Sequence, residues 1–233
     1  MLLLLSNSTN HGSAMFAHAR EALARSFDGR EVLFVPYAAA DHDAYSAKAV
    51  DAFAGIGVRA RQVPARDPAA AIRGADAVFV GGGNSFRLLR DLQRTGLIAA
   101  IREAVAHGAR YGGASAGTNM ACPTLCTTND MPIVEPAGFG ALGLLPFQIN
   151  PHYLDPDPGS RHMGETREAR IAEFHEENDV PVLGLREGAW LLRDASLSLH
   201  GHTARLFRRG EEPVELAPGA DLGDLLTSTP GGS

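Results

Sequence analysis

Short apolar runs and amphipathic stretches alternate along the first half of the chain. The apolar runs have the length and composition of strands, and the stretches between them repeat apolar residues at helical spacing. Because the strands are apolar nearly throughout, we expect a mostly parallel sheet sandwiched between helices, an α/β fold. Strands are predicted at Leu2–Leu5, Glu31–Tyr37, Val58–Val63, Asp76–Gly83 and within Ala109–Gly117. Helices are predicted over Ser13–Arg25, His42–Phe53, Asp67–Ala75, Asn84–Gly96 and Leu97–Gly108.

The pattern is less regular in the second half. Glycine and proline are frequent between Asn129 and Asn150, where one short strand is predicted near Leu145–Ile149. A helix is predicted over Glu165–Glu176, and the sequence beyond it reads as several short strands joined by turns, which we expect to be antiparallel. No repeat or linker divides the chain, so we predict a single domain over residues 1–225 and a disordered tail over residues 226–233.

Composition narrows the class of partner. The 233 residues are 45% hydrophobic, and 21 Lys and Arg against 27 Asp and Glu give a net charge of -6. This balance argues against a nucleic-acid or membrane-surface partner. No apolar run is long enough to span a bilayer, and the opening leucine run is too short for a signal peptide, so we expect a cytoplasmic protein.

Only two cysteines occur, Cys122 and Cys126, which is too few for a disulfide framework. A zinc site would need two further ligands from elsewhere in the chain. We therefore expect buried structural thiols, no metal, and a reducing compartment.

One serine lies in a turn made of small residues. Gly113, Ala114, Ala116 and Gly117 surround Ser115, giving G-x-S-x-G between a predicted strand and a helix. In that context the motif is typical of a nucleophile at a sharp turn, since small neighbours let the backbone fold beneath the exposed hydroxyl. The amide of Ala116 would then face an oxyanion from a helix N-terminus. A serine that only caps the helix is the structural alternative.

A second glycine-rich turn, Gly81–Gly83, follows another predicted strand. It lacks the third glycine of a dinucleotide fingerprint and the lysine of a phosphate-binding loop. Without side chains, the amides of Gly82 and Gly83 could approach a reacting carbonyl and complete an oxyanion hole. A tight strand–helix connection explains the same glycines, and Asn84 either binds substrate or caps the following helix.

A serine nucleophile needs a base, and the base needs an acid that orients it. Among nine histidines, His152 follows a short apolar stretch and a proline, from which a loop can direct it back over the sheet. Two carboxylates are candidates for the acid. Asp130 would give the chain order Ser–Asp–His typical of α/β-hydrolases, and Glu187, at another predicted strand end, would give Ser–His–Glu. Spacing does not separate these two.

Seven segments occur in combination: LLLLSNST, VGGGNSF, GASAGTNMACPT, TTNDMPIV, LPFQINPHY, GETREARI and GLREGAW. Together they resemble the peptidase E, or aspartyl dipeptidase, family, and the similarity runs from the first strand to about Phe207. The resemblance implies a flavodoxin-like sandwich similar to class I glutamine amidotransferase domains, with serine in place of their cysteine. It also implies cleavage of dipeptides that begin with aspartate, without a metal or an organic cofactor.

The same resemblance implies roles for individual residues. Ser115 would be the nucleophile, His152 the general base and then acid, and Glu187, rather than Asp130, the residue that orients the histidine. One departure is Ala114, where a larger residue such as tryptophan is common in the family. The acidic, proline-rich loop Tyr153–Met163 is a second variable feature, and both bear on pocket shape and substrate access.

An N-terminal aspartate presents a carboxylate and an ammonium group. The resemblance favours Arg167 for the carboxylate, which a guanidinium can hold with two hydrogen bonds. Arg170 lies three residues further along the same predicted helix and could assist, and Glu165 could meet the ammonium. A solvated, charged helix explains the same three residues.

Two other functions stay open at this point. The G-x-S-x-G motif alone also fits an esterase-like serine hydrolase, although the chain lacks an HGGG-type oxyanion motif. A non-catalytic flavodoxin-like domain could bind an anion at both glycine-rich turns, with Ser115 as a hydrogen-bond donor. We expect a small peptide as the partner and a homodimer as the assembly, as for many enzymes of this size.

Overall fold

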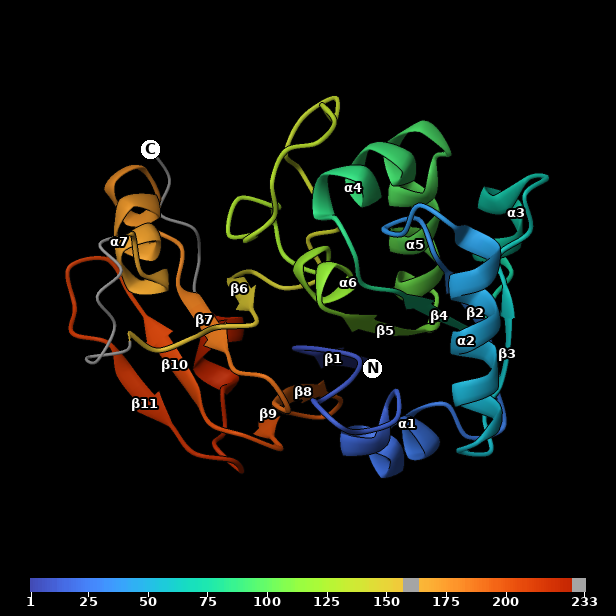
Figure 1. Cartoon of the computed structure of the whole chain (residues 1–233), viewed down its shortest axis with the longest axis horizontal. Coiled ribbons are helices and arrows are strands. Elements are labelled where there is room, and N and C mark those ends of the chain that lie inside the picture. Colours follow the sequence, from blue (N-terminus) through green and yellow to red (C-terminus); the bar gives the residue numbers. More distant parts are fainter. Residues whose placement is uncertain (157–163, 228–233) are drawn as a thin grey trace.

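The computed structural model describes residues 1–156 and 164–227, which form two sheets (Figure 1). The larger sheet has seven strands in the order β3-β2-β4-β5-β1-β8-β9. Strands β3, β2, β4, β5 and β1 are parallel; β8 pairs antiparallel with β1, and β9 pairs antiparallel with β8. The predicted α/β fold with a mostly parallel sheet is therefore confirmed. Its strands are β1 (Leu2–Leu5), β2 (Glu31–Val35), β3 (Arg59–Gln62), β4 (Ala77–Val80), β5 (Arg110–Ala114), β8 (Trp190–Arg193) and β9 (Leu197–His200).

The smaller sheet has four strands in the order β11-β10-β7-β6. The prediction of antiparallel strands after the helix over Glu165–Glu176 is confirmed, because β7, β10 and β11 pair antiparallel here and β8 and β9 do so in the larger sheet. The earlier strand β6 pairs parallel with β7, since a helical crossover, α7 (Arg167–Glu177), connects them. β6 begins at Gln148, later than the strand predicted near Leu145–Ile149, since Leu145 packs into the core as part of a loop. The strands are β6 (Gln148–Pro151), β7 (Val182–Leu185), β10 (Ala204–Phe207) and β11 (Val214–Leu216).

Helices cover both faces of the larger sheet (Figure 1). One face packs against α1 (Arg20–Ser26) and α2 (His42–Ala54), and the other against α3 (Pro68–Arg73), α4 (Ser85–Arg94) and α5 (Leu97–Ala106). The short α6 (Ala116–Asn119) directly follows β5. Aspartate, asparagine or threonine side chains cap four of these helices by accepting a backbone N–H three residues on. The caps are Asp41, Asp67, Asn84 and Thr166.

The first helix is shorter than predicted. Instead of a continuous helix over Ser13–Arg25, a 3-10 turn, η1 (Ala17–Ala19), precedes α1. Phe16 has a left-handed backbone (φ 66), which interrupts the helix and places its ring in the core against Phe53 and Phe79. Burial of this ring therefore overrides the local helical pattern.

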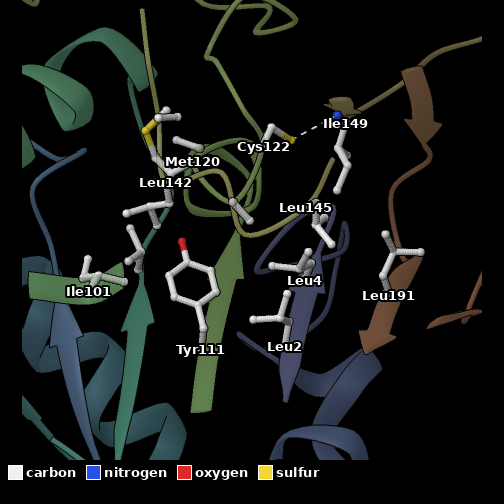
Figure 2. Packing of buried hydrophobic residues seen from close by; sticks show 14 of the residues in the cluster. Leu2, Leu4, Ile101, Tyr111, Met120, Cys122, Leu142, Leu145, Ile149 and Leu191 are labelled. Atoms are coloured by element: carbon white, nitrogen blue, oxygen red, sulfur yellow. Dashed lines mark hydrogen bonds between the residues drawn. The ribbon is translucent and has the colours of Figure 1, made fainter. Parts of the chain in front are cut away.

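Successive side chains of the strands enter two different cores, as the two-residue period of a strand requires. Leu3 and Leu5 of β1 pack with the α1–α2 layer, whereas Leu2 and Leu4 pack with the α3–α5 layer and with residues of the smaller sheet. Figure 2 shows this second core around Tyr111. The two sheets thus share one hydrophobic core, which fixes their relative position.

The two cysteines differ in environment. Cys122 is buried in the core, and its Sγ accepts the N–H of Ile149 at 3.2 Å (Figure 2). Burial raises the pKa of this thiol to about 12, so it is an unreactive structural group. Cys126 is exposed, so the prediction of two buried thiols is wrong for this residue, which lies in a surface loop beyond the apolar stretch.

The chain end is ordered slightly further than predicted. A 3-10 turn, η2 (Gly223–Leu226), packs against the core through Leu225 and Leu226. Of the tail predicted over residues 226–233, positions 228–233 lie outside the described residues, as does most of the predicted Tyr153–Met163 loop. Within the described ranges, no helix is long and apolar enough to cross a bilayer.

Candidate active site

Ser115 occupies a strained turn between β5 and α6. Its backbone angles (φ 55, ψ -113) are a combination that side chains other than glycine rarely adopt. The glycines on either side are required by packing. A Cβ on Gly113 would lie 2.5 Å from the carbonyl oxygen of Gly117, and a Cβ on Gly117 would collide with the carbonyl of Val80. The two glycines therefore let the turn fold tightly on itself and pack against the end of β4, while the hydroxyl stays accessible.

Three hydrogen bonds hold this turn in place. The N–H of Ser115 donates to Leu5 O at 3.1 Å, and the hydroxyl of Thr118 donates to the same oxygen at 2.6 Å. The buried hydroxyl of Tyr111 donates to Gly117 O at 2.6 Å. Hydrogen bonds to Leu5 at the end of β1 thus hold the strained backbone of Ser115 in place.

His152 follows β6 directly and also has a left-handed backbone (φ 53). Its N–H donates to Ser6 Oγ at 2.9 Å, and the Ser6 hydroxyl donates in turn to Leu185 O at 2.7 Å. Ser6 therefore joins the ends of β1, β6 and β7 at one point. Sequence reasoning missed this residue, although a polar residue directly after a buried strand of a parallel sheet is a signal that could have indicated it.

Ser115, His152 and Glu187 form a hydrogen-bonded series. His152 Nε2 lies 2.8 Å from Ser115 Oγ, and His152 Nδ1 lies 2.8 Å from Glu187 Oε1. A carboxylate can only accept, so Nδ1 carries the proton and Nε2 is free to accept the serine hydroxyl. The His152 side chain is 38% exposed and that of Glu187 is 52% exposed, so substrate and water can reach the series.

Glu187 is held in the turn after β7 by a residue that sequence reasoning also missed. The N–H of Gly188, which has a left-handed backbone (φ 80), donates to Oδ1 of the buried Asn7 at 2.8 Å. Asn7 in turn donates to Asn10 Oδ1 at 2.7 Å. The polar loop after β1 therefore positions both the histidine and the glutamate.

Asp130, the alternative acid, lies at a different place. Its Oδ2 accepts both the N–H and the hydroxyl of Ser85 at 2.7 Å, at the first turn of α4. The carboxylate therefore compensates unpaired donors at a helix N-terminus. Of the two acids left open by spacing, Glu187 is the one in contact with His152.

The second glycine-rich turn lies beside Ser115. A Cβ on Gly82 would lie 3.0 Å from Ser115 Cβ, and Gly83 has a positive φ of 133. The prediction for Gly82 needs correction, because its N–H already donates to Tyr45 Oη at 2.9 Å. Within residues 1–156 and 164–227, the N–H groups of Gly83 and Ala116 have no acceptor, and Gly83 also lines the cavity beside Ser115.

Asn84 caps α4 rather than facing the cavity. Its Oδ1 accepts Arg87 N–H at 3.0 Å, and its Nδ2 donates to Met131 O at 2.9 Å. Of the two interpretations of this residue, the structure therefore supports the cap. A cavity of about 300 Å³ lies beside Ser115 and His152, and its lining also includes Thr9, Tyr45, Gly82 and Gly83.

The basic residues predicted for substrate binding lie at the start of α7, outside the lining of that cavity. Arg170 pairs with Glu165 at 3.5 Å, and both side chains are at least half exposed. Arg167 is half-buried and has no ion-pair partner among the described residues. Burial lowers the pKa of its guanidinium, Arg170 lowers it further, and Asp130 opposes both effects. A guanidinium stays charged in proteins, so Arg167 is an under-compensated cation.

A hydroxyl, an imidazole and a carboxylate in series at the carboxyl edge of a parallel sheet can generate an alkoxide nucleophile without other groups. This arrangement, on this fold, defines the class of serine-hydrolase-like α/β proteins. In the described part of the chain, no group of three or more His, Cys, Asp or Glu is placed to hold a metal ion.

Comparison with known proteins agrees with this class. The model of peptidase family S51 matches residues 2–199. The chain is 60% identical to a peptidase E of Streptomyces coelicolor, covering 97% of this chain and 94% of the relative. It is 48% identical to a probable alpha-aspartyl dipeptidase of Drosophila melanogaster, covering 97% of both. A crystal structure of a putative peptidase E from Listeria monocytogenes has the same fold (TM-score 0.61, 22% identity, 93% of this chain and 97% of that one).

The chain therefore belongs to peptidase family S51.

Proposed function

We propose that this chain is a serine dipeptidase that cleaves Asp-Xaa dipeptides after the N-terminal aspartate. The observation that carries the proposal is the series Ser115 Oγ, His152 and Glu187, with both hydrogen bonds at 2.8 Å. Family S51 membership and the relatives named peptidase E and probable alpha-aspartyl dipeptidase support the substrate class.

The proposed reaction proceeds through an acyl-enzyme. His152 Nε2 takes the hydroxyl proton as Ser115 Oγ attacks the peptide carbonyl, and Glu187 stabilises the imidazolium that results. The N–H groups of Gly83 and Ala116 stabilise the oxyanion. The imidazolium then gives its proton to the departing amine, the C–N bond breaks, and water, deprotonated by His152, hydrolyses the ester and releases aspartate.

Selection of aspartate is assigned to Arg167. This guanidinium is half-buried, lacks an ion-pair partner in the described structure, and has a second cation, Arg170, close enough to disfavour its charge. A substrate carboxylate would compensate that charge with directional hydrogen bonds. Asparagine has nearly the same shape without the charge, so Asn-Xaa leaves Arg167 uncompensated and reacts more slowly.

The first test compares release of leucine from Asp-Leu, Asn-Leu, Glu-Leu and Ala-Leu by the wild-type chain and by Ser115→Ala. We expect rapid cleavage of Asp-Leu alone, and a loss of roughly a millionfold in kcat for the variant, since the nucleophile is removed. Wild-type protein that cleaves no dipeptide, or a Ser115→Ala variant with full activity, would contradict the proposal.

A second test separates the supporting roles. Glu187→Gln is expected to lower kcat by about 10⁴-fold, because the histidine loses the partner that fixes its tautomer. Arg167→Ala is expected to raise KM for Asp-Leu and to narrow the preference over Asn-Leu. Arg170→Ala is the matched control, since this neighbouring arginine is already paired with Glu165. Equal effects of the two arginine variants on selectivity would remove the role given to Arg167.

A further inference from the structure

Most backbone N–H groups in the turn over residues 81–84 already donate hydrogen bonds within the protein. The N–H of Gly81 donates to Val35 O at 3.0 Å, and the N–H of Asn84 donates to Ala38 O at 3.0 Å. Between them, the N–H of Gly82 donates to Tyr45 Oη at 2.9 Å. As far as the described residues show, the amide of Gly83 is the one left without an acceptor, and Gly83 is exposed toward the cavity beside Ser115.

Packing restricts this turn from both sides. A Cβ on Gly83 would lie 2.5 Å from Ala38 O, and a Cβ on Gly82 would lie 3.0 Å from Ser115 Cβ. Glycine is needed for this close approach, but glycine also leaves the backbone with the largest choice of conformations. The direction of the free amide therefore depends on the hydrogen bonds at its two ends rather than on intrinsic stiffness.

Tyr45 supplies the only side chain among these anchors. It projects from α2, and its ring packs edge-on against Phe34 with the centroids 5.2 Å apart. The ring fits beneath the turn because Gly81 lacks a Cβ, which would lie 2.7 Å from Tyr45 Cε1. Burial raises the pKa of the phenol, so its oxygen is a neutral acceptor throughout the range in which a histidine base works.

We propose that Tyr45 is a positioning residue for the oxyanion site. By accepting the N–H of Gly82 it fixes one end of the Gly82–Gly83 peptide, while the Asn84–Ala38 hydrogen bond fixes the other, so that the Gly83 amide stays directed at the oxyanion formed on attack by Ser115. Electrostatic stabilisation requires donors that are in place before the charge develops, and this hydrogen bond provides that preorganisation. The inference rests on the proposed serine mechanism.

The test is Tyr45→Phe, which keeps the ring and removes the acceptor. We expect kcat for Asp-Leu to fall roughly 10- to 100-fold with KM nearly unchanged, because the amide is misdirected rather than deleted; losing an oxyanion donor outright costs about 100- to 1,000-fold. Tyr37→Phe is the matched control, since Tyr37 is also buried near this turn and its hydroxyl makes no hydrogen bond within the described residues. Its kcat is expected to stay within about twofold of wild type.

A second readout separates positioning from a general change in the cavity. An aspartate-derived aldehyde forms a tetrahedral adduct with the serine, and its affinity should fall by the same factor as kcat/KM in Tyr45→Phe, while affinity for the product aspartate stays unchanged. Equal losses for aldehyde and aspartate, or an unaltered kcat, would overturn the inference. If Tyr45→Phe fails to fold, replacement of Tyr45 by 4-aminophenylalanine, a poor acceptor of similar volume, should give the same loss, and full activity would overturn the inference.

The two proposals fail differently. A wild-type chain that cleaves no dipeptide would overturn the proposed function and this inference with it. An active wild type whose Tyr45→Phe variant is equally active would overturn the role of Tyr45 alone.

Discussion

At the scale of single residues, the candidate site depends on positions where a side chain is missing. Gly117 is the sharpest case, because any Cβ there would collide with the carbonyl of Val80 at the end of β4. The turn that carries Ser115 is therefore in direct backbone contact with the neighbouring strand. The strained backbone of Ser115 is maintained by this contact and by the hydrogen bonds to Leu5.

Gly117→Ala should separate these two segments. We expect the free energy of unfolding to fall by about 2–3 kcal/mol and peptidase activity to fall as Ser115 shifts, since overpacking forces backbone movement. Gly138→Ala is the control, because nothing lies within 4 Å of a Cβ built at that position. Urea unfolding of the three proteins measures the effect, and equal stability of the two variants would contradict the prediction.

Sequence reasoning worked well for residues whose role is local. The small residues around Ser115 indicated a tight turn, and Asn84 was recognised as a possible cap, because both depend on neighbours in the chain. Ser6, Asn7 and Tyr45 were missed. Their partners are His152, Gly188 and Gly82, each far away in the sequence. The position of Ser6 directly after a buried strand could have marked it as a site residue, but no local pattern identifies which residue each of the three contacts.

At the scale of elements, the loop after α6 and the start of α4 are joined by Asp130. Its carboxylate accepts two hydrogen bonds from Ser85, and the hydroxyl of Thr128 donates to Ser85 Oγ at 2.9 Å. A negative charge at this end of α4 also offsets the helix dipole. Asp130 is thus a structural link between two elements that border the site.

Asp130→Ala is expected to lower the free energy of unfolding by about 1–3 kcal/mol, because the Ser85 donors lose a charged acceptor. Glu135→Ala, an exposed carboxylate further along the same loop, should change stability by less than about 0.5 kcal/mol. Chemical denaturation at neutral pH measures both. A stability of Asp130→Ala equal to that of wild type would show that the link contributes nothing.

The elements themselves were largely predictable. Apolar runs located β1, β2 and β4, because strands buried on both faces leave a continuous apolar signal. β6 was displaced by three residues, since it contains Asn150 and Pro151 and pairs on one side only. Its parallel pairing with β7 could not be read from the pattern of either strand, because it follows from the crossover through α7.

At the scale of the whole molecule, the segments that carry His152 and Glu187 are tied together by Arg186. Its guanidinium binds Asp155 with two hydrogen bonds at 2.7 and 2.8 Å and also pairs with Glu215 of β11, while it lies over the ring of Tyr153. The Arg186 side chain is only 13% exposed. Tyr153 adjoins His152 and Arg186 adjoins Glu187, so this cluster keeps the base and the acid at a fixed distance.

This cluster predicts a loss of stability in acid. Hydrogen bonds from Arg186, followed by the charges of Arg186 and Arg205, outweigh burial and lower the pKa of Asp155 in the folded state. The resulting stabilisation is complete above the unfolded pKa of about 3.9 and is lost as the pH falls through the lower folded value. Urea unfolding from pH 6 to about pH 2 should show this decline, and Arg186→Met should make it shallower. An identical pH dependence in the variant would contradict the assignment.

The central place of β1 in the larger sheet has a consequence for how the protein is made. Leu2 pairs with Tyr111 on one side and with Arg193 on the other. At ribosomal rates of about 5–20 residues per second, roughly 5–20 s pass between the synthesis of β1 and that of its neighbour β5, and more time passes before β8 is made. A chain that ends before Trp190 lacks β8, so one edge of β1 has no paired strand. Because an unpaired strand edge can pair with another chain, incomplete chains should aggregate, and only full-length chains should be active.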